Sequence, residues 1–322
     1  MKDLHCSGPP ADFFHARISH TTQLEGTTIN KRIPPKISTT ICFSFLVMFI
    51  AGCASQKETG RSPDTGLSLR YQLPESKPLN YERSSSMNQV IQRMGQEITV
   101  TMEMGSFYSL ISKGTQQGNL RMGVTIDSMK MRITSPQGEM NPDMKSLRGK
   151  NFIMSLSPRG KESDLSGAEA ISYTLAPGNE RNVGAEFQAL FPDFPEQSLK
   201  IGDTWPSVDT MRIKSQGGEM TFVSNNLNAF RAFVTVDGME CVTISSTGTG
   251  TVEGKGQQGP ANLITKGTIQ GTDTVYFAYK RGIVIKSVSH ATAESVVTVE
   301  GAGQDMTIPI KMKTIYKTTL RE

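Results

Sequence analysis

The chain offers few side chains that could carry out catalysis. Three of its four histidines lie within the first 30 residues, and the fourth is His290, which directly follows Ser289. A Ser-His nucleophile requires contact between the two side chains. The residues around this pair alternate as in a strand, where adjacent side chains point to opposite faces. We therefore interpret His290 as a surface or partly packed residue and predict no catalytic residue.

The sequence also contains no pattern typical of a metal site or a nucleotide-binding site. His290 and Cys241 are too few for a His/Cys zinc site, and no run of alternating aspartates suits calcium. The stretch Gly248-x-Gly250-x-x-x-Gly254-Lys255-Gly256 has Thr249 where a phosphate-binding loop needs glycine, and Glu253 breaks the dinucleotide fingerprint. We predict a flexible hairpin tip here, with neither a metal nor a cofactor.

Asp203 is the remaining candidate for carboxylate chemistry. It lies in Gly202-Asp203-Thr204-Trp205, which contains the only tryptophan of the chain. Aspartate favours turns that its own side chain closes, and such a turn would place Trp205 in the core. We interpret Gly202, Asp203 and Trp205 as a motif that is structural or ligand-facing.

The segment 37–53, ISTTICFSFLVMFIAGC, indicates the cellular location of the rest of the chain. It carries no charged residue, follows Lys31, Arg32 and Lys36, and has an apolar run at residues 41–50. A cationic lead, a short apolar run and small residues before a cleavage site are typical of a secretory signal. The run is shorter than the ~20 apolar residues of a membrane-spanning helix.

Its last four residues, Ile50, Ala51, Gly52 and Cys53, resemble the lipobox of bacterial lipoproteins. The resemblance implies cleavage before Cys53 and lipidation of its thiol, and two acyl chains anchor a protein stably. An ordinary secreted protein and an uncleaved short anchor are the alternatives. Residues 1–30 are polar and unlike a signal, so we expect translation to start near Leu24 or Ile29.

Behind the signal (residues 1–52), residues 53–67 comprise the lipidated cysteine and a polar, flexible tether. The chain lacks an aspartate after Cys53, which in enteric bacteria retains lipoproteins at the inner membrane. By this resemblance we expect a periplasm-facing anchor in the outer membrane. Loss of residues 1–52 leaves a net charge of +2, scattered along the chain, which gives no indication of a nucleic-acid partner.

The remaining chain predicts a mainly β protein. Ile98, Val100, Met102 and Met104 alternate with polar residues, as in a strand with one buried face. Similar patterns occur at residues 229–236, 240–245, 274–279, 283–288, 295–299 and 306–316, and a change of phase near Asp127 predicts a bulge. The short gaps between these segments favour antiparallel pairing.

Two short helices are expected, near residues 141–149 and 183–191. Glycines recur at an offset of 122, as in Gly95 and Gly217, which suggests an internal duplication. We predict two similar β-rich halves, 68–195 and 196–322, in a barrel-like or half-barrel body.

Between these halves stand Phe191-Pro192, Pro195 and Ile201-Gly202-Asp203-x-Trp205. In these motifs residues 68–322 resemble an uncharacterised family of bacterial envelope lipoproteins of unknown function. A weaker architectural resemblance, to half-barrel lipoprotein carriers, implies an acyl chain held between sheet and helix.

Methionine is abundant, with 15 of 17 beyond residue 52. Methionine fills cores and also lines adaptable apolar surfaces. Residues on the apolar phase of predicted strands could therefore line a ligand site: Met102, Met104, Met129, Met131, Met306 and Met312.

Three functional classes follow. The leading prediction is a non-enzymatic, membrane-tethered envelope lipoprotein that binds an amphiphilic ligand or a protein partner. A structural or assembly lipoprotein without a cavity is the second. A carboxylate-based hydrolase, which needs two acids about 5–10 Å apart, is the third.

Overall fold

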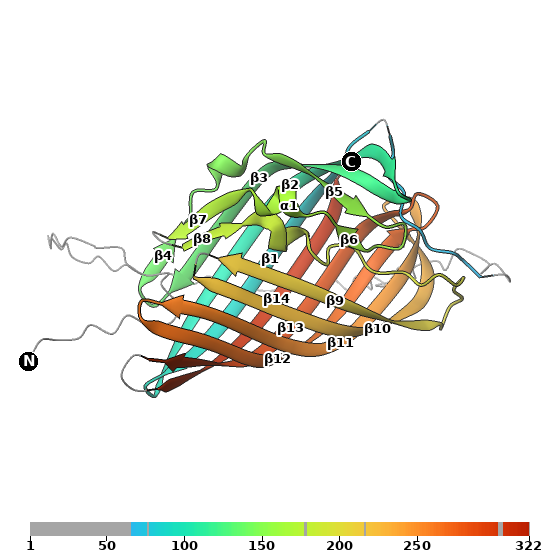
Figure 1. Cartoon of the computed structure of the whole chain (residues 1–322). Helices are drawn as coiled ribbons and strands as arrows, with labels where there is room; N and C mark the ends of the chain where they lie inside the picture. The colour runs from blue at the N-terminus through green and yellow to red at the C-terminus, as the bar shows by residue number, and fades with distance from the viewer. Residues whose placement is uncertain (1–65, 76, 177–178, 216, 302–304, 322) are drawn as a thin grey trace, which may run out of the picture. The chain divides into compact units, whose positions relative to one another are not determined.

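The structure, a computed structural model, describes residues 66–321 apart from 76, 177–178, 216 and 302–304. Its strands are antiparallel and belong to one sheet (Figure 1). They are β1 (Leu79–Arg93), β2 (Gln96–Gln116), β3 (Asn119–Ser135), β4 (Gly138–Met140), β5 (Asn151–Leu156), β6 (Glu162–Ser163), β7 (Ser172–Ala176), β8 (Asn179–Asn182), β9 (Thr204–Ser215), β10 (Gly218–Val236), β11 (Met239–Gln258), β12 (Ala261–Ala278), β13 (Ile283–Glu300) and β14 (Met306–Arg321).

The order of the strands follows the chain except at two places, where β5 lies next to β3 and β1 lies next to β14. It runs β6-β5-β3-β2-β1-β14-β13-β12-β11-β10-β9-β8-β7, and β4 pairs with β3. The first long strand thus pairs with the last, in register from Asn80 opposite Arg321 to Ile91 opposite Ile310. The mainly β, antiparallel, half-barrel prediction is confirmed.

Helical structure is limited to short turns among the described residues. The segments η1 (Lys145–Leu147) and η2 (Val183–Phe187) are 3-10 turns, and α1 (Ser166–Glu169) is one α-helical turn. The two expected helices therefore occur at the right places but are shorter and tighter than an α-helix. In η2 the Asn182 side chain accepts a hydrogen bond from Gly184 N, as an N-cap does.

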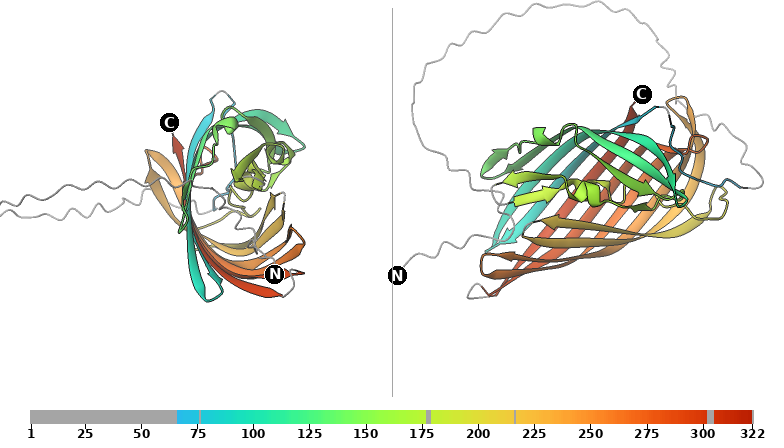
Figure 2. Two further views of the ribbon diagram at one scale, coloured as in Figure 1. Left: turned by 90° about the vertical axis from the view of Figure 1, so that its left-hand side faces the viewer. Right: turned by 45° about the horizontal axis from the view of Figure 1, so that its top comes forward.

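The sheet curls around the residues that connect β8 to β9 (Figure 2). Residues 183–203, called the inner segment below, pack against its inner face through aromatic rings. Phe187 contacts Tyr108 and Phe152 edge-on, with ring centroids 5.5 and 5.0 Å apart. Further along, Phe194 stacks on Tyr71 at 5.0 Å. This packing fills one part of the half-barrel with a large apolar core.

The predicted bulge is confirmed. Phe107 pairs with Ser128 and Tyr108 with Ile126, which leaves Asp127 as the extra residue. The Gly-rich stretch was predicted wrongly, because Gly248–Gly256 lies inside β11 and not at a hairpin tip. Both predicted halves contribute to this sheet, while their duplication stays a prediction.

Candidate functional site

The inner face of strands β9 to β13 carries adjacent groups of hydrogen-bonded polar side chains. Asn226 donates from Nδ2 to Asp209 Oδ2 at 2.7 Å, and Ser224 donates to Asn226 Oδ1 at 2.8 Å. One register step away, Asn228 donates from Nδ2 to Ser207 Oγ at 3.0 Å, and Ser246 donates to Asn228 Oδ1 at 2.5 Å. We call this set, with Asp273 and Ser289, the inner polar network.

Glycine makes room for this network. A Cβ atom on Gly248 would lie 2.1 Å from Asn226 Oδ1 and 2.8 Å from Ser224 Oγ. At Gly250 a Cβ would lie 1.7 Å from the backbone oxygen of Val223. Glycine inside a strand marks such a close approach. The Gly-rich stretch therefore serves the shape of the inner face.

Both carboxylates of the network have raised pKa values. Burial raises the pKa of Asp209 above its ordinary value, and the charges of Asp193 and Asp273 raise it further while Lys161 lowers it. Burial also raises the pKa of Asp273, against a hydrogen bond from Ser289. Such carboxylates suit a ligand that supplies hydrogen-bond donors or positive charge.

An apolar patch adjoins this network on the same inner face. Phe222, Val252 and Ala293 are buried and form a cluster separate from the main core. Half-buried apolar side chains from four strands pack around them: Met211, Ile213, Met220, Ile269 and Met312. The register places Met211 and Ile213 two and four residues beyond Asp209 on β9, on the same side of the sheet. The inner face is therefore amphipathic.

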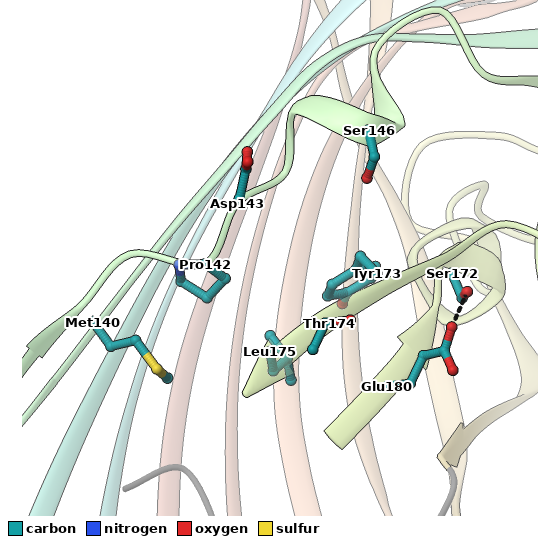
Figure 3. A pocket seen from close by; sticks show the side chains of 9 residues that line it. All are labelled: Met140, Pro142, Asp143, Ser146, Ser172, Tyr173, Thr174, Leu175 and Glu180. Atoms are coloured by element: carbon teal, nitrogen blue, oxygen red, sulfur yellow. Dashed lines mark hydrogen bonds between the residues drawn. The ribbon is translucent and has the colours of Figure 1, made fainter. Parts of the chain in front are cut away.

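A pocket of about 510 Å³ lies where the two ends of the sheet approach each other (Figure 3). One wall comes from Met140, Pro142, Asp143 and Ser146, and the other comes from residues 172–175 and Glu180. Its volume falls within the ~300–1,000 Å³ of small-molecule sites. Asp143 and Glu180 are already engaged, because Asp143 Oδ1 accepts from Lys145 N at 3.0 Å and Glu180 Oε1 accepts from Ser172 Oγ. We call it the seam pocket.

The six methionines expected to line a ligand site divide into two groups. Met104, Met129 and Met131 are buried in the main core. Met102 and Met306 are half-buried against that core, and Met312 belongs to the apolar patch. The first three are thus core filling, whereas the last three remain partly open on the inner face.

The Gly-Asp-x-Trp motif makes structural contacts. Asp203 Oδ2 accepts from Lys200 N at 2.8 Å, and Gly202 has a φ of +94°. Trp205 is 3% exposed and donates from Nε1 to Asp193 O at 2.8 Å. Trp205 is thus buried in the core, as expected. Its neighbour Asp209, which the motif does not include, reaches the inner polar network instead.

The register also separates His290 from Ser289. Ser289 faces Asp273 on the inner side, whereas His290 is exposed on the outer side. Cys241 is fully buried, and burial raises the pKa of its thiol to about 11, which suppresses its reactivity. Among the described residues no three His, Cys, Asp or Glu side chains are placed to bind a metal ion.

Sequence reasoning missed the inner polar network. Its members lie between Ser207 and Ser289 and meet only through the pairing of five strands. Their signal in the sequence is weak, because serine and asparagine on one phase of a strand look like a solvated face.

Ile50, Ala51, Gly52 and Cys53 lie outside the described residues. Within the described part of the chain, no helix is long and apolar enough to cross a membrane.

Comparison with known proteins finds weak similarities of structure. No family model and no curated protein matches the chain. A structure described as "Asymmetric conductivity of engineered proteins" is 8% identical, covers 76% of this chain and 99% of its own, and has a TM-score of 0.16. That of Pseudomonas aeruginosa OccK11 (OpdR) is 8% identical, covers 79% and 100%, and has a TM-score of 0.15. Similarities this weak support no inference about function.

Proposed function

We propose that this protein is a non-enzymatic bacterial envelope lipoprotein, tethered to the outer membrane through Cys53, that binds an amphiphilic ligand on the inner face of its half-barrel. The anchor is supported by the signal segment and by Ile50-Ala51-Gly52-Cys53. The observation that carries the binding function is the half-buried apolar patch beside the inner polar network.

This arrangement suits a molecule with one apolar and one polar end. Met211, Met220 and Met312 are flexible and half-buried, so they can adapt to a chain of variable shape. A polar headgroup would meet Asp209 and Asp273, whose raised pKa values reflect carboxylates held away from water. A ligand that donates hydrogen bonds would compensate for that burial.

The test is native mass spectrometry with solvent extraction on the body from Gly66 onward, made without its anchor in a bacterial envelope. We expect one amphiphile at fixed stoichiometry, lost when Met211 and Met312 are replaced by glutamate. Met140→Glu in the seam pocket is the control and should keep the ligand. Loss of the ligand only in Met140→Glu would indicate that the ligand binds in the seam pocket. A ligand-free wild type would favour a structural role with protein partners.

A carboxylate-based hydrolase is the second candidate, because Asp209 and Asp273 share the inner face and the charge of Asp273 raises the pKa of Asp209. Glycan and ester substrates, each assayed with the wild type and Asp273→Asn, test it. Turnover that the substitution abolishes would establish this activity, and no turnover would exclude it for those substrates.

A further inference from the structure

The outer face of the sheet carries a basic surface around strand β14. Lys313 and Lys317 lie on this face two register steps apart, and Lys286 follows on the neighbouring strand β13. On the other side of β14, Lys317 pairs with Ser84 on β1, which pairs with Gly105 on β2, which in turn pairs with Lys130 on β3. We call such a line of cross-strand partners a register row. All four lysines are exposed. The row spans about 14 Å, because neighbouring strands are ~4.8 Å apart.

Three acids of this region are already paired with other cations, and a fourth, Asp127, is exposed beside Ser128 on β3. Glu82 pairs with Arg321, Glu294 with Lys311 at 3.4 Å, and Glu103 with Arg132 at 3.8 Å. Within the described strand pairs, no acidic residue lies directly opposite Lys313 or Lys317. The cross-strand neighbours of Lys313 are Asn88 and Thr292. Those of Lys317 are Ser84 and Val288. The region therefore has a net positive charge that its own carboxylates do not neutralise.

Two apolar side chains stand exposed within the same region. Ile315 is 39% exposed and lies between Lys313 and Lys317 on β14. Phe107 is 45% exposed and lies in the register row that leads through Glu82 and Thr319 to Lys286. We call these six residues, Phe107, Lys130, Lys286, Lys313, Ile315 and Lys317, the outer basic face.

We propose that the outer basic face docks on a membrane surface rich in anionic phospholipids. Lysines near such a surface are attracted to its negative headgroups, and exposed apolar side chains between them can enter the interface. The chain also permits this contact, because only residues 53–65 separate Cys53 from the body, and 13 extended residues reach at most about 45 Å. The tether argument rests on the proposed lipidation, whereas the charge argument does not.

Docking in this way would set the orientation of the half-barrel. The outer face of the adjacent strands β13, β14 and β1 (Figure 1) would lie on the headgroups. The inner face of these strands would therefore point away from the bilayer. The amphiphile site would then be open toward the periplasm and to whatever delivers or receives the ligand there.

The experiment measures binding of the unacylated body, residues 66–322, to phosphatidylcholine vesicles with and without 30% phosphatidylglycerol. That body contains the whole described sheet and its core. We expect cosedimentation with the anionic vesicles at 50 mM salt and release at 500 mM, where the Debye length falls to a few Å (about 10 Å at 0.1 M). Lys313→Glu with Lys317→Glu should weaken binding at least about 25-fold, since each lysine contributes roughly fivefold.

The matched control is Lys200→Glu with Lys255→Glu, which changes the net charge by the same amount at exposed positions outside the outer basic face. It should weaken binding by less than about threefold. Phe107→Ser should reduce binding without changing its salt dependence. Circular dichroism establishes that each variant is folded.

Equal loss in the patch and control variants, equal binding to neutral vesicles, or no binding at 50 mM salt would each overturn the proposal. Because the body carries no acyl chain and the vesicles no envelope amphiphile, these outcomes are independent of the ligand and of Cys53. A ligand-free mass spectrum would count against the proposed function and leave the docking result standing.

Discussion

Glu162 is the side chain that fastens the inner segment to the edge strand β6. Its Oε1 accepts hydrogen bonds from Leu190 N at 2.7 Å and from Phe191 N at 2.9 Å. Burial nevertheless raises the pKa of this carboxyl to about 7, because the loss of water outweighs the two backbone donors. Folding therefore takes up a proton near neutral pH.

This linkage predicts a pH-dependent stability. A raised folded-state pKa means that the protonated carboxyl favours the fold, so its contribution is present below about pH 4.5 and is lost as the pH rises to about 7. The decrease amounts to at most about 3 kcal/mol. In Glu162→Gln the amide oxygen can still accept both hydrogen bonds but does not titrate, so urea unfolding between pH 5 and 8 should show a flatter profile. An unchanged slope would contradict this assignment.

Gly160 shows how closely the inner segment approaches the sheet. Its φ is +108°, and a Cβ there would lie 2.2 Å from Pro192 O, which also accepts a hydrogen bond from Tyr71 Oη at 3.0 Å. A side chain at this position would therefore push the inner segment away.

Gly160→Ala should destabilise the protein by about 2–4 kcal/mol, through backbone strain and the clash together. Gly95→Ala is the control, because its φ is +76° with nothing within 4 Å of the added Cβ. It should cost only about 1 kcal/mol. Equal midpoints of urea unfolding in the two variants would show that the clash is relieved elsewhere.

At the scale of elements, Arg83 joins strand β1 to η2. Its guanidinium contacts both Glu186 O, at 2.5 Å, and Glu186 Oε2, at 3.3 Å, and lies 4.9 Å from the Tyr316 ring centroid. The side chain is only 14% exposed, so these contacts are largely shielded from water.

Arg83→Met should therefore lower the free energy of unfolding by about 1–3 kcal/mol, because Glu186 O and its carboxylate lose their donor. Arg321→Met is the comparison, since its ion pair with Glu82 is more exposed, at 58% for Arg321. Exposed pairs contribute at most about 1 kcal/mol. Thermal unfolding of both variants checks the difference, and an equal effect would contradict the role of Arg83.

Strand β9 pairs with β8 at Arg181 opposite Ser215, and side chains cover other parts of that edge of β9, away from β10. The Gln188 side chain donates to Arg212 O at 3.2 Å and accepts from Arg212 N at 2.7 Å, much as a neighbouring strand would. Lys161 Nζ donates to Val208 O at 3.2 Å, and Pro206 has no N–H to offer. These groups protect the edge against pairing with another chain.

For the folded body, the decisive contact is the pairing of β1 with β14. It joins β1–β6, from the first half of the body, to β9–β14, from the second, within one sheet. Both halves also contribute to the main apolar core. The core residues of one half thus lack a covering surface without the other.

Deletion of residues 306–322 should therefore abolish cooperative unfolding of the whole body, because it removes the strand between β1 and β13. Deletion of Arg321 and Glu322 alone should leave the transition cooperative, with a loss of at most about 1 kcal/mol. Urea unfolding followed by near-ultraviolet circular dichroism distinguishes these results. A cooperative transition in the longer deletion would mean that the halves fold independently.

Much of this architecture could be predicted from local patterns, but not its extent. The alternation at residues 98–104 and 306–316 predicted strands that exist, and the change of phase near Asp127 located a real bulge. The segments 283–288 and 295–299 proved to be parts of the single strand β13. The polar and glycine-rich residues of β11 and β12 lack apolar alternation, because half of them face water on the outer side and the rest form the polar part of the inner face.

The sequence by itself determined which residues alternate, and therefore that antiparallel strands bury one face; it also placed Trp205 in the core and marked Cys53 as the predicted anchor. Only the tertiary structure decided that the first and last strands pair, that the sheet curls around the inner segment, and that Asp209 and Asp273 share one face. The physical reason is that a period of two residues records burial on one side of a strand. Strand partners and sheet curvature depend instead on contacts between residues more than 200 positions apart, such as Tyr81 Oη donating to Val284 O at 2.8 Å.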